Sequence, residues 1–378
     1  MIAFRVHLWM AAGSLAVAAG LAHAAEFKVG IVGPLSGGAA VYGIEPLEGA
    51  KFALEEIHKS GLLGSHRVTL VPADSAGNPG QAAQAARRMI ESDNVLAILG
   101  SMTSAETQAM IEVTRAAGVP HLSPGAQDAS LTKQGNKWFS RISLDADRWA
   151  EYAVGWIAGK HKAKSVYILA RNDNYGRSLT EGMVRYFKDK QVNVLDTIYY
   201  EPSNKDFKPM LVKLRNANPD FIVLNGFYTD LGLVVKQIGE LQIKFPIYTG
   251  TAAAIPQFAD IAGPAANGAY GTAYYFAGSI DTAAGKRFQE GWRAKFKRDP
   301  SQYEGMGYDA MYVLAEAMRN ADKAGKLDRE GLRDAIYAIK DFEGGTGRIS
   351  IRPNGDVERP VPFFRLKDRK LEFDFLAK

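Results

Sequence analysis

The chain has 378 residues, of which 47% are hydrophobic and 23% are charged, as is typical of a globular protein with two domains. Its 46 basic and 41 acidic residues leave a net charge of +5, with no long basic block or aromatic-basic alternation suited to a nucleic-acid groove. We therefore expect no nucleic-acid partner.

Residues 1–24 have the pattern of a secretory signal peptide. Arg5 supplies the positive start, Leu8 to Leu21 form an apolar stretch, and Ala22-His23-Ala24 is a small-residue cleavage signal, which predicts a mature chain that begins at Ala25. A retained membrane anchor is the alternative, and the short, glycine-interrupted stretch disfavours it.

The sequence contains no cysteine, so it can carry neither a disulfide nor a lipid-modified N-terminal cysteine. Together with the signal peptide, this predicts a protein of a Gram-negative periplasm without a lipid anchor. The histidines outside the signal peptide form no H-x-H or H-x-x-x-H pair, and we expect no metal site and no cofactor.

The first part of the mature chain alternates strands and helices. Short apolar runs predict strands at Phe27–Val32, Val68–Val71, Val95–Leu99 and Val119–Leu122. Helices are predicted from Pro46, over Gln81–Glu91, and from Thr103 to Ala117. This order is typical of a parallel sheet with helices on its faces.

Two polar turns follow neighbouring strands, at Gly100–Ser104 and at Ser123–Gln127. Thr103 and Glu106 have the spacing of a capping box, which would place a helix N-terminus at the first turn. In a parallel sheet both turns lie at the carboxyl ends of strands, where backbone N–H groups favour an anion. We expect a carboxylate to bind here.

From Ser143 the same alternation restarts, which predicts a second lobe. Its expected strands are Ser165–Ala170, Val192–Tyr199, Phe221–Leu224 and Phe245–Tyr248, between helices at 148–160, 177–187, 205–216 and 231–241. Helices are then predicted at 283–298, 307–324 and 329–340, followed by strands at 348–351 and 362–375.

Five segments resemble those of the leucine/isoleucine/valine-binding proteins of bacterial ABC importers, in the same order over the whole mature chain: Val29–Gly37, Leu99–Thr107, Ser123–Ala126, Asp173–Gly176 and Asn225–Tyr228. The resemblance implies the type I periplasmic-binding fold, an α/β architecture of two doubly wound parallel-sheet lobes joined by three strands. We place the crossings near Arg141, Gly271–Tyr275 and Arg348–Ile351.

The expected division is residues 25–141 plus 275–348 for the first lobe and 142–274 plus 349–378 for the second. The resemblance implies a periplasmic receptor, not an enzyme, which captures an amino acid, branched-chain or related, between the lobes. Its expected partners are that small carboxylate ligand and an ABC permease in the inner membrane, and the receptor is expected to be a monomer.

The resemblance also assigns a binding site, residue by residue. Tyr42 would form an aromatic wall, Ser104 and the backbone of Gly125 would hold the carboxylate, and Tyr175 with Phe227 or Tyr228 would face them from the second lobe. Loop packing for Tyr42, helix capping for Ser104 and core packing for the other aromatic residues are the alternatives.

Two positions depart from the family pattern, and both concern the ligand. Gln127 stands where threonine is common, and Thr251 stands where the family has a glutamate that holds the α-ammonium. An enclosed, unpaired ammonium is costly, so either Asp173, Asp230 or Asp309 replaces that glutamate or the ligand is an ammonium-free carboxylate such as an aromatic acid.

Other functional classes have weaker support. Ser130 and Lys133 have the S-x-x-K spacing of serine acyltransferases, but no S-D-N or K-T-G motif accompanies them, and a chance match is expected. A ligand-sensing domain of a regulatory system shares the same fold and cleft, so it stays an alternative to transport.

Overall fold

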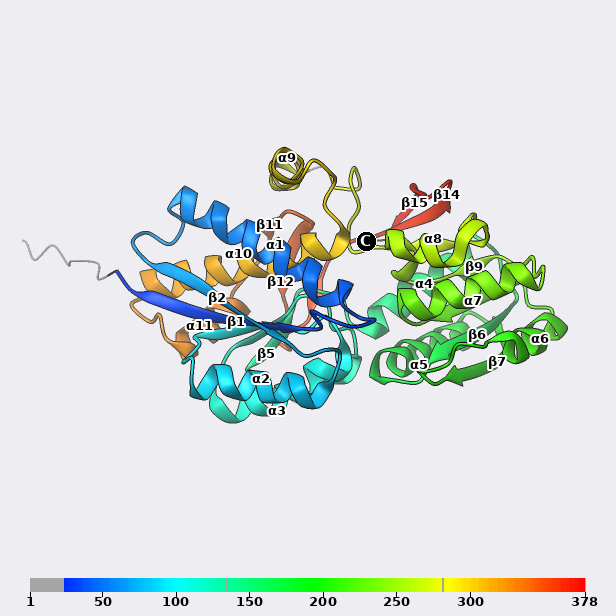
Figure 1. Ribbon diagram of the computed structural model, residues 1–378, viewed down its shortest axis with the longest axis horizontal. Helices are drawn as coiled ribbons and strands as arrows, with labels where there is room; N and C mark the ends of the chain where they lie inside the picture. Colours follow the sequence, from blue (N-terminus) through cyan, green and yellow to red (C-terminus); the bar gives the residue numbers. More distant parts are fainter. Residues whose placement is uncertain (1–23, 134, 281, 378) are drawn as a thin grey trace, which may run out of the picture.

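The computed structural model describes residues 24–133, 135–280 and 282–377, so the predicted signal peptide lies outside it except for Ala24. Figure 1 shows two lobes side by side along the longest axis of the molecule. Each lobe is assembled from segments that are far apart in the sequence, which confirms the predicted two-lobed α/β architecture.

The first lobe is built on a five-stranded, all-parallel sheet with the order β2-β1-β3-β4-β5. Its strands are β1 (Glu26–Gly33), β2 (Arg67–Asp74), β3 (Ala97–Gly100), β4 (His121–Ser123) and β5 (Phe139–Arg141). Helices α1 (Val41–Ser60) and α10 (Gln302–Lys323) pack together on one face, and α2 (Pro79–Glu91) and α3 (Ser104–Ala117) on the other (Figure 1). The first lobe also contains α9 (Ala283–Phe296), α11 (Arg329–Tyr337) and a small sheet of β11 (Phe342–Gly344), β12 (Gly347–Ile351) and β13 (Val357–Glu358).

The second lobe is built on a seven-stranded sheet with the order β15-β14-β10-β9-β8-β6-β7. Its strands are β6 (Ser165–Arg171), β7 (Asn193–Tyr200), β8 (Phe221–Asn225), β9 (Ile247–Tyr248), β10 (Tyr270–Thr272), β14 (Val361–Lys367) and β15 (Lys370–Ala377). Strands β14 and β15 form an antiparallel hairpin at one edge, β14 also pairs antiparallel with β10, and the remaining pairs are parallel. Helix α4 (Ala146–Gly159) packs beside α5 (Asn174–Asp189), whereas α7 (Tyr228–Glu240) contacts α6 (Lys208–Ala217) and α8 (Pro256–Ala262).

Helices α1 and α10 approach each other closely through two glycines. A Cβ on Gly49 would lie 1.9 Å from the carbonyl oxygen of Glu304, and one on Gly307 would lie 2.0 Å from that of Pro46. Since no larger residue fits, these glycines bring the start of α1 next to the start of α10. Helix α1 begins at Val41 rather than at Pro46, so the predicted start is wrong, and Pro46 lies inside the helix.

Three segments connect the lobes: residues 142–145, residues 273–280 and residues 359–360. The expected crossings near Arg141 and Gly271–Tyr275 lie at the first two of these segments. Arg348–Ile351 lies instead in β12 and pairs with β11 and β13. Polar and apolar side chains alternate along Arg348–Ile351, and this pattern fits a short strand in either lobe. Only the backbone pairing with neighbouring strands shows which sheet the strand belongs to.

Arg359, in the third connection, is buried and hydrogen-bonded to both of the others. Its guanidinium donates to the carbonyl oxygens of Ile142 at 3.1 Å and Tyr274 at 3.3 Å. It also donates to the hydroxyl of Thr346 at 2.7 Å, and that hydroxyl donates to the buried carboxylate of Asp309. One side chain therefore fixes the three connections relative to one another.

Candidate functional site

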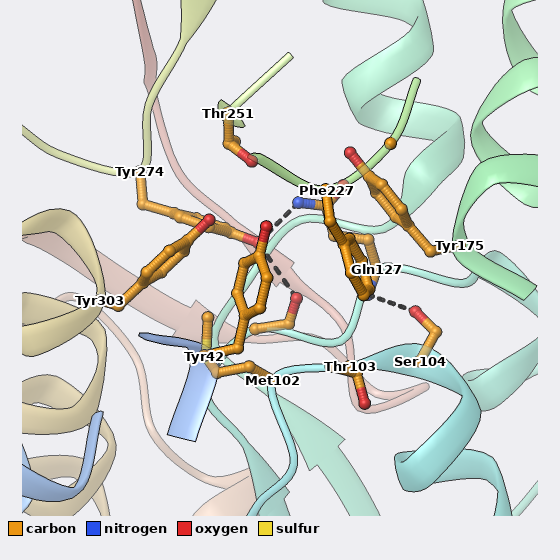
Figure 2. A pocket seen from close by; sticks show the side chains of 12 residues that line it. Tyr42, Met102, Thr103, Ser104, Gln127, Tyr175, Phe227, Thr251, Tyr274 and Tyr303 are labelled. Atoms are coloured by element: carbon orange, nitrogen blue, oxygen red, sulfur yellow. Dashed lines mark hydrogen bonds between the residues drawn. The ribbon is translucent and has the colours of Figure 1, made fainter. Parts of the chain in front are cut away.

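A pocket lies between the lobes (Figure 2). Its lining residues come from both lobes and from one connection: Tyr42, Met102, Thr103, Ser104, Gly125, Gln127, Tyr175, Gly226, Phe227, Thr251, Tyr274 and Tyr303. Several of them follow the carboxyl ends of β3, β4, β8 and β9, which is where open parallel sheets bind ligands.

The structure brings together all the predicted site residues except Tyr228. Tyr228 is the first residue of α7, and its ring centroid lies 5.8 Å from that of Tyr42. Its hydroxyl donates to the carbonyl oxygen of Gly38 at 3.4 Å, so Tyr228 links the lobes outside the pocket.

Ser104 holds the two polar turns together. Its hydroxyl oxygen accepts the backbone N–H groups of Gln127, at 3.2 Å, and of Asp128, at 3.1 Å. In the described part of the chain the hydroxyl hydrogen has no acceptor, so Ser104 can donate a hydrogen bond into the pocket.

The predicted capping box at the start of α3 is wrong in its details. Thr103 is the N-cap, but its hydroxyl donates to the Glu106 carboxylate at 2.8 Å instead of accepting a backbone N–H. The same carboxylate accepts the hydroxyls of Ser75, at 2.6 Å, and Ser101. Glu106 is buried among three hydroxyl groups. A carboxylate accepts hydrogen bonds and donates none, so the Thr103 hydroxyl donates to it instead of accepting a backbone N–H.

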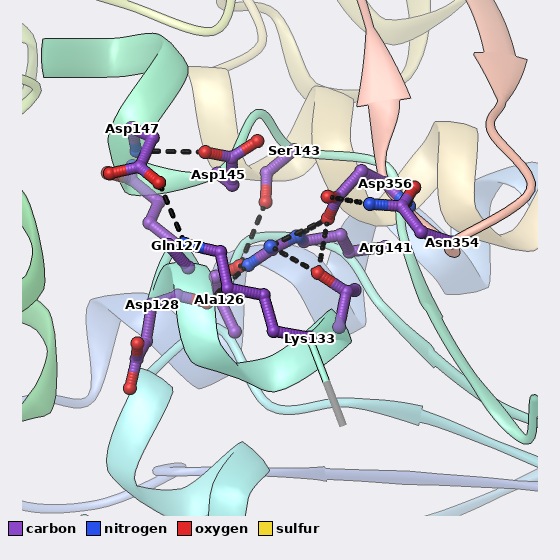
Figure 3. A network of polar contacts seen from close by, with 12 residues as sticks. Ala126, Gln127, Asp128, Lys133, Arg141, Ser143, Asp145, Asp147, Asn354 and Asp356 are labelled. Carbon is purple, nitrogen blue, oxygen red and sulfur yellow. Dashed lines mark hydrogen bonds and ion pairs between the residues drawn. The ribbon is translucent and has the colours of Figure 1, made fainter. Parts of the chain in front are cut away.

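The turn that contains Gly125 and Gln127 is fixed from behind by a buried ion pair (Figure 3). Arg141 donates to the carbonyl oxygens of Ala126, at 3.1 Å, and Asp128, at 2.7 Å, and lies 2.6 Å from the carboxylate of Asp356. The turn is therefore preorganised before a ligand arrives.

Gln127 joins this turn to the connection between the lobes. Its side-chain amide donates to the hydroxyl of Tyr274 at 2.6 Å, and that hydroxyl donates to the carbonyl oxygen of Gly125 at 3.0 Å. These bonds, drawn in Figure 2, orient the Tyr274 ring along the pocket.

Aromatic rings from both lobes form the walls. The Tyr42 ring centroid lies 4.8 Å from Phe227 and 5.2 Å from Tyr303, and the Tyr175 and Phe227 rings stack at 5.9 Å. Burial raises the pKa of Tyr274 to about 12, and it raises the pKa values of Tyr42, Tyr175 and Tyr303 above the usual range of a phenol. The phenols are therefore neutral hydrogen-bonding groups on apolar walls.

No aspartate, glutamate, lysine, arginine or histidine of the described chain lines this pocket. Asp173 and Asp230 both pair with Arg171, whose guanidinium lies over the Phe227 ring at 4.3 Å from its centroid, and they line an adjoining cavity. Asp309 lies under the connections and accepts the backbone N–H groups of Gly345 and Thr346. Each predicted substitute for the family's glutamate is therefore occupied elsewhere.

Sequence reasoning missed five lining residues: Met102, Thr103, Gly226, Tyr274 and Tyr303. Four lie in predicted segments: Met102 and Thr103 in the first polar turn, Gly226 in the turn after β8, and Tyr274 in the second connection. No local sequence pattern marked Tyr303 as a pocket residue. It lies near the start of α10, and that helix begins at Gln302, five residues before the predicted start at Gly307.

Hydrogen bonds across the pocket hold the lobes closed over it. The backbone N–H of Tyr228 donates to the hydroxyl of Tyr42 at 3.3 Å, and the side-chain amide of Gln302 donates to the carbonyl oxygen of Thr251 at 3.1 Å. A third bond, from the N–H of Ala129 to the hydroxyl of Ser178, is 3.0 Å long. The structure is a closed form.

Across the described residues, we find no helix both long enough and apolar enough to cross a membrane. Residues 26–370 match the family model described as periplasmic binding protein. The leucine-, isoleucine-, valine-, threonine-, and alanine-binding protein of Pseudomonas aeruginosa is 27% identical over 333 residues, 88% of this chain and 87% of that relative.

Two solved structures are similar over nearly the full length. A leucine binding protein from Thermotoga maritima has a TM-score of 0.87 and 28% identity, covering 93% of this chain and 98% of its own. A branched-chain amino acid transporter substrate binding protein from Streptococcus pneumoniae, in complex with isoleucine, has a TM-score of 0.84 and 25% identity, covering 92% and 98%. The fold, the pocket between the lobes and the match over residues 26–370 show that this chain belongs to the periplasmic binding protein family.

Proposed function

We propose that this protein is the substrate-binding component of an ABC importer, which captures a small carboxylate between its lobes and delivers it to a permease in the inner membrane. The observation that carries the proposal is the closed pocket, whose walls come from both lobes and whose closing bonds cross between them. Relatives named for amino-acid binding and transport support it. In this role the protein binds its ligand without changing it chemically.

Closure supplies the mechanism. The first lobe offers Ser104 and the fixed turn at Gly125 and Gln127, and the second lobe offers Tyr175 and Phe227 only when the lobes meet. A ligand that contacts both lobes shifts the equilibrium toward the closed form. To reverse an open-to-closed ratio of 99:1, it must prefer the closed form by about 5.5 kcal/mol.

Two ligand classes are candidates. The names of the relatives favour an amino acid, branched-chain or related. The absence of any carboxylate from the described pocket lining favours an acid without an ammonium group.

We also propose that the mature chain starts at Ala25, remains monomeric and works in the periplasm. The pairing of β12 and β13 with β11 supports a first lobe of residues 25–141 plus 275–358, which moves the last expected boundary from 348 to 358.

Mass spectrometry of the protein purified without denaturation tests the proposal by identifying the ligand that co-purifies. After ligand removal, small-angle X-ray scattering should show a larger radius of gyration, which falls when that ligand is restored. Deletion of the gene should abolish cellular uptake of the same ligand. Unchanged scattering would contradict the closure mechanism, and normal uptake with an altered transcriptional response would favour sensing.

A further inference from the structure

We infer that the ligand is an aromatic monocarboxylate that carries no ammonium group. This inference rests on the proposed receptor function and specifies its substrate class. It follows from the polarity of the hydrogen-bonding groups in the pocket, from the charges around the pocket and from the shape of its walls.

The hydrogen-bonding groups that remain free in the pocket are mainly donors. The Ser104 hydroxyl already accepts two N–H groups, which leaves its hydrogen to donate. The Tyr42 hydroxyl accepts the N–H of Tyr228, and in the described chain its hydrogen has no acceptor. The Tyr175 hydroxyl has no hydrogen-bond partner among these residues although the side chain is buried. A carboxylate accepts several hydrogen bonds and donates none, so it complements this set.

An ammonium group would not complement the free hydrogen-bond donors of this pocket. It brings a positive charge and three donors, and no carboxylate of the described lining faces it. Asp173 and Asp230 line an adjoining cavity, which shares Ser104, Tyr175 and Phe227 with this pocket, and both are already paired with Arg171. Thr251, which lines the pocket, offers only a neutral hydroxyl. Enclosing an ammonium here would leave a buried charge without a partner.

The walls fit a flat apolar body. Tyr175 and Phe227 stand nearly parallel, at 29° and 5.9 Å, on the side of the second lobe. Tyr42 and Tyr303 face them from the first lobe, and Tyr274 closes one end edge-on to Tyr303 (Figure 2). An aromatic ring bound against the ring faces and edges that line this pocket would make stacked and edge contacts at once, whereas a branched aliphatic chain makes neither.

Two matched ligand pairs test the inference directly, by calorimetric titration of the ligand-free mature protein. Phenylalanine and 3-phenylpropanoate differ only in the ammonium group, as do leucine and 4-methylpentanoate. We expect each ammonium-free acid to bind at least tenfold more tightly than its amino acid, and 3-phenylpropanoate to bind more tightly than 4-methylpentanoate. Tighter binding of either amino acid would overturn the inference.

A variant at position 251 tests the cause of the preference. Thr251→Glu introduces a carboxylate and should lower the ratio of 3-phenylpropanoate to phenylalanine affinity at least tenfold, whereas Thr251→Gln, of the same size without the charge, should not. An unchanged ratio in Thr251→Glu would overturn the electrostatic argument. Thermal unfolding of both variants establishes that they are folded.

The outcomes also separate this inference from the receptor function. If none of the four ligands binds but another co-purified ligand closes the lobes, the aromatic-acid inference fails and the receptor function stands. If the ligand-free protein does not close with any ligand, both fail.

Discussion

The hydroxyl of Tyr42 accepts the backbone N–H of Tyr228 at 3.3 Å, and the two residues belong to opposite lobes. The bond exists only while the lobes are closed, so its free energy contributes to ligand affinity. Tyr42→Phe should weaken binding by about 0.5–1.5 kcal/mol, because the ring contacts with Phe227 and Tyr303 remain. Calorimetry measures the change. Tyr199→Phe, on β7 away from the pocket, is the matched control and should bind normally.

Ser104→Ala should affect both binding and stability. It removes a donor to the ligand and leaves the backbone N–H groups of Gln127 and Asp128 without their acceptor, so we expect affinity to fall by about 1–3 kcal/mol. Calorimetry and urea unfolding measure the two effects separately. Normal affinity would remove Ser104 from the site, and Ser130→Ala, at an exposed serine, should change neither quantity.

Arg359→Met should destabilise the protein by about 3–5 kcal/mol, since it removes the donors to Ile142, Tyr274 and Thr346 and leaves the buried Asp309 without its cation. Urea unfolding measures the loss. Arg365→Met provides the comparison, because that exposed arginine lies over the Tyr270 ring, and its loss should cost no more than about 0.5 kcal/mol. Equal effects of the two substitutions would refute a special role for Arg359.

Glu45 gives the protein a specific pH dependence. Burial raises the pKa of its carboxyl from 4.5 to about 7, although the hydroxyl of Ser301 donates to it at 2.6 Å. Between about pH 4.5 and pH 7 the Glu45 carboxyl holds a proton in the folded state that the unfolded chain has released. The contribution of this protonated carboxyl to the free energy of unfolding is therefore complete below pH 4.5 and is lost as the pH rises through 7.

Glu45→Gln should therefore be more stable than the wild type at pH 8, by about 1–2 kcal/mol, with a difference that vanishes near pH 4.5. Urea midpoints across this range measure it. Glu91→Gln, at an exposed glutamate, should follow the wild-type profile, and a constant difference for Glu45→Gln would contradict the raised pKa.

The signal peptide predicts a location that can be measured. Expressed with residues 1–24 in a Gram-negative host, the protein should appear in the osmotic-shock fluid with Ala25 as its first residue. N-terminal sequencing of that fraction tests this, and an intact chain beginning at Met1 in the membrane fraction would contradict it. Expression from Ala25 onward should retain the protein in the cytoplasm.

The sequence was sufficient to predict elements that depend on local patterns. Buried strands such as β6 and β8 and the end of α3 at Gly118, which adopts a left-handed conformation, follow from apolar runs and glycine chemistry. The pocket lining was predictable where a family motif carries it, as at Ser104 and Phe227. Tyr303 and the partners of Glu106 were not, because they depend on which distant segments pack together.

Helix α10, which covers α1 on one face of the first sheet, is separated from it in the sequence by the elements of the second lobe from α4 to β10. The hairpin of β14 and β15, which completes the second sheet, comes later still. During synthesis from the N-terminus, neither lobe can assemble its full core until the last segments of the nascent chain have been made. The order of segments thus delays folding until translation is nearly complete, and no single cut in the chain yields two fragments that each contain a complete lobe.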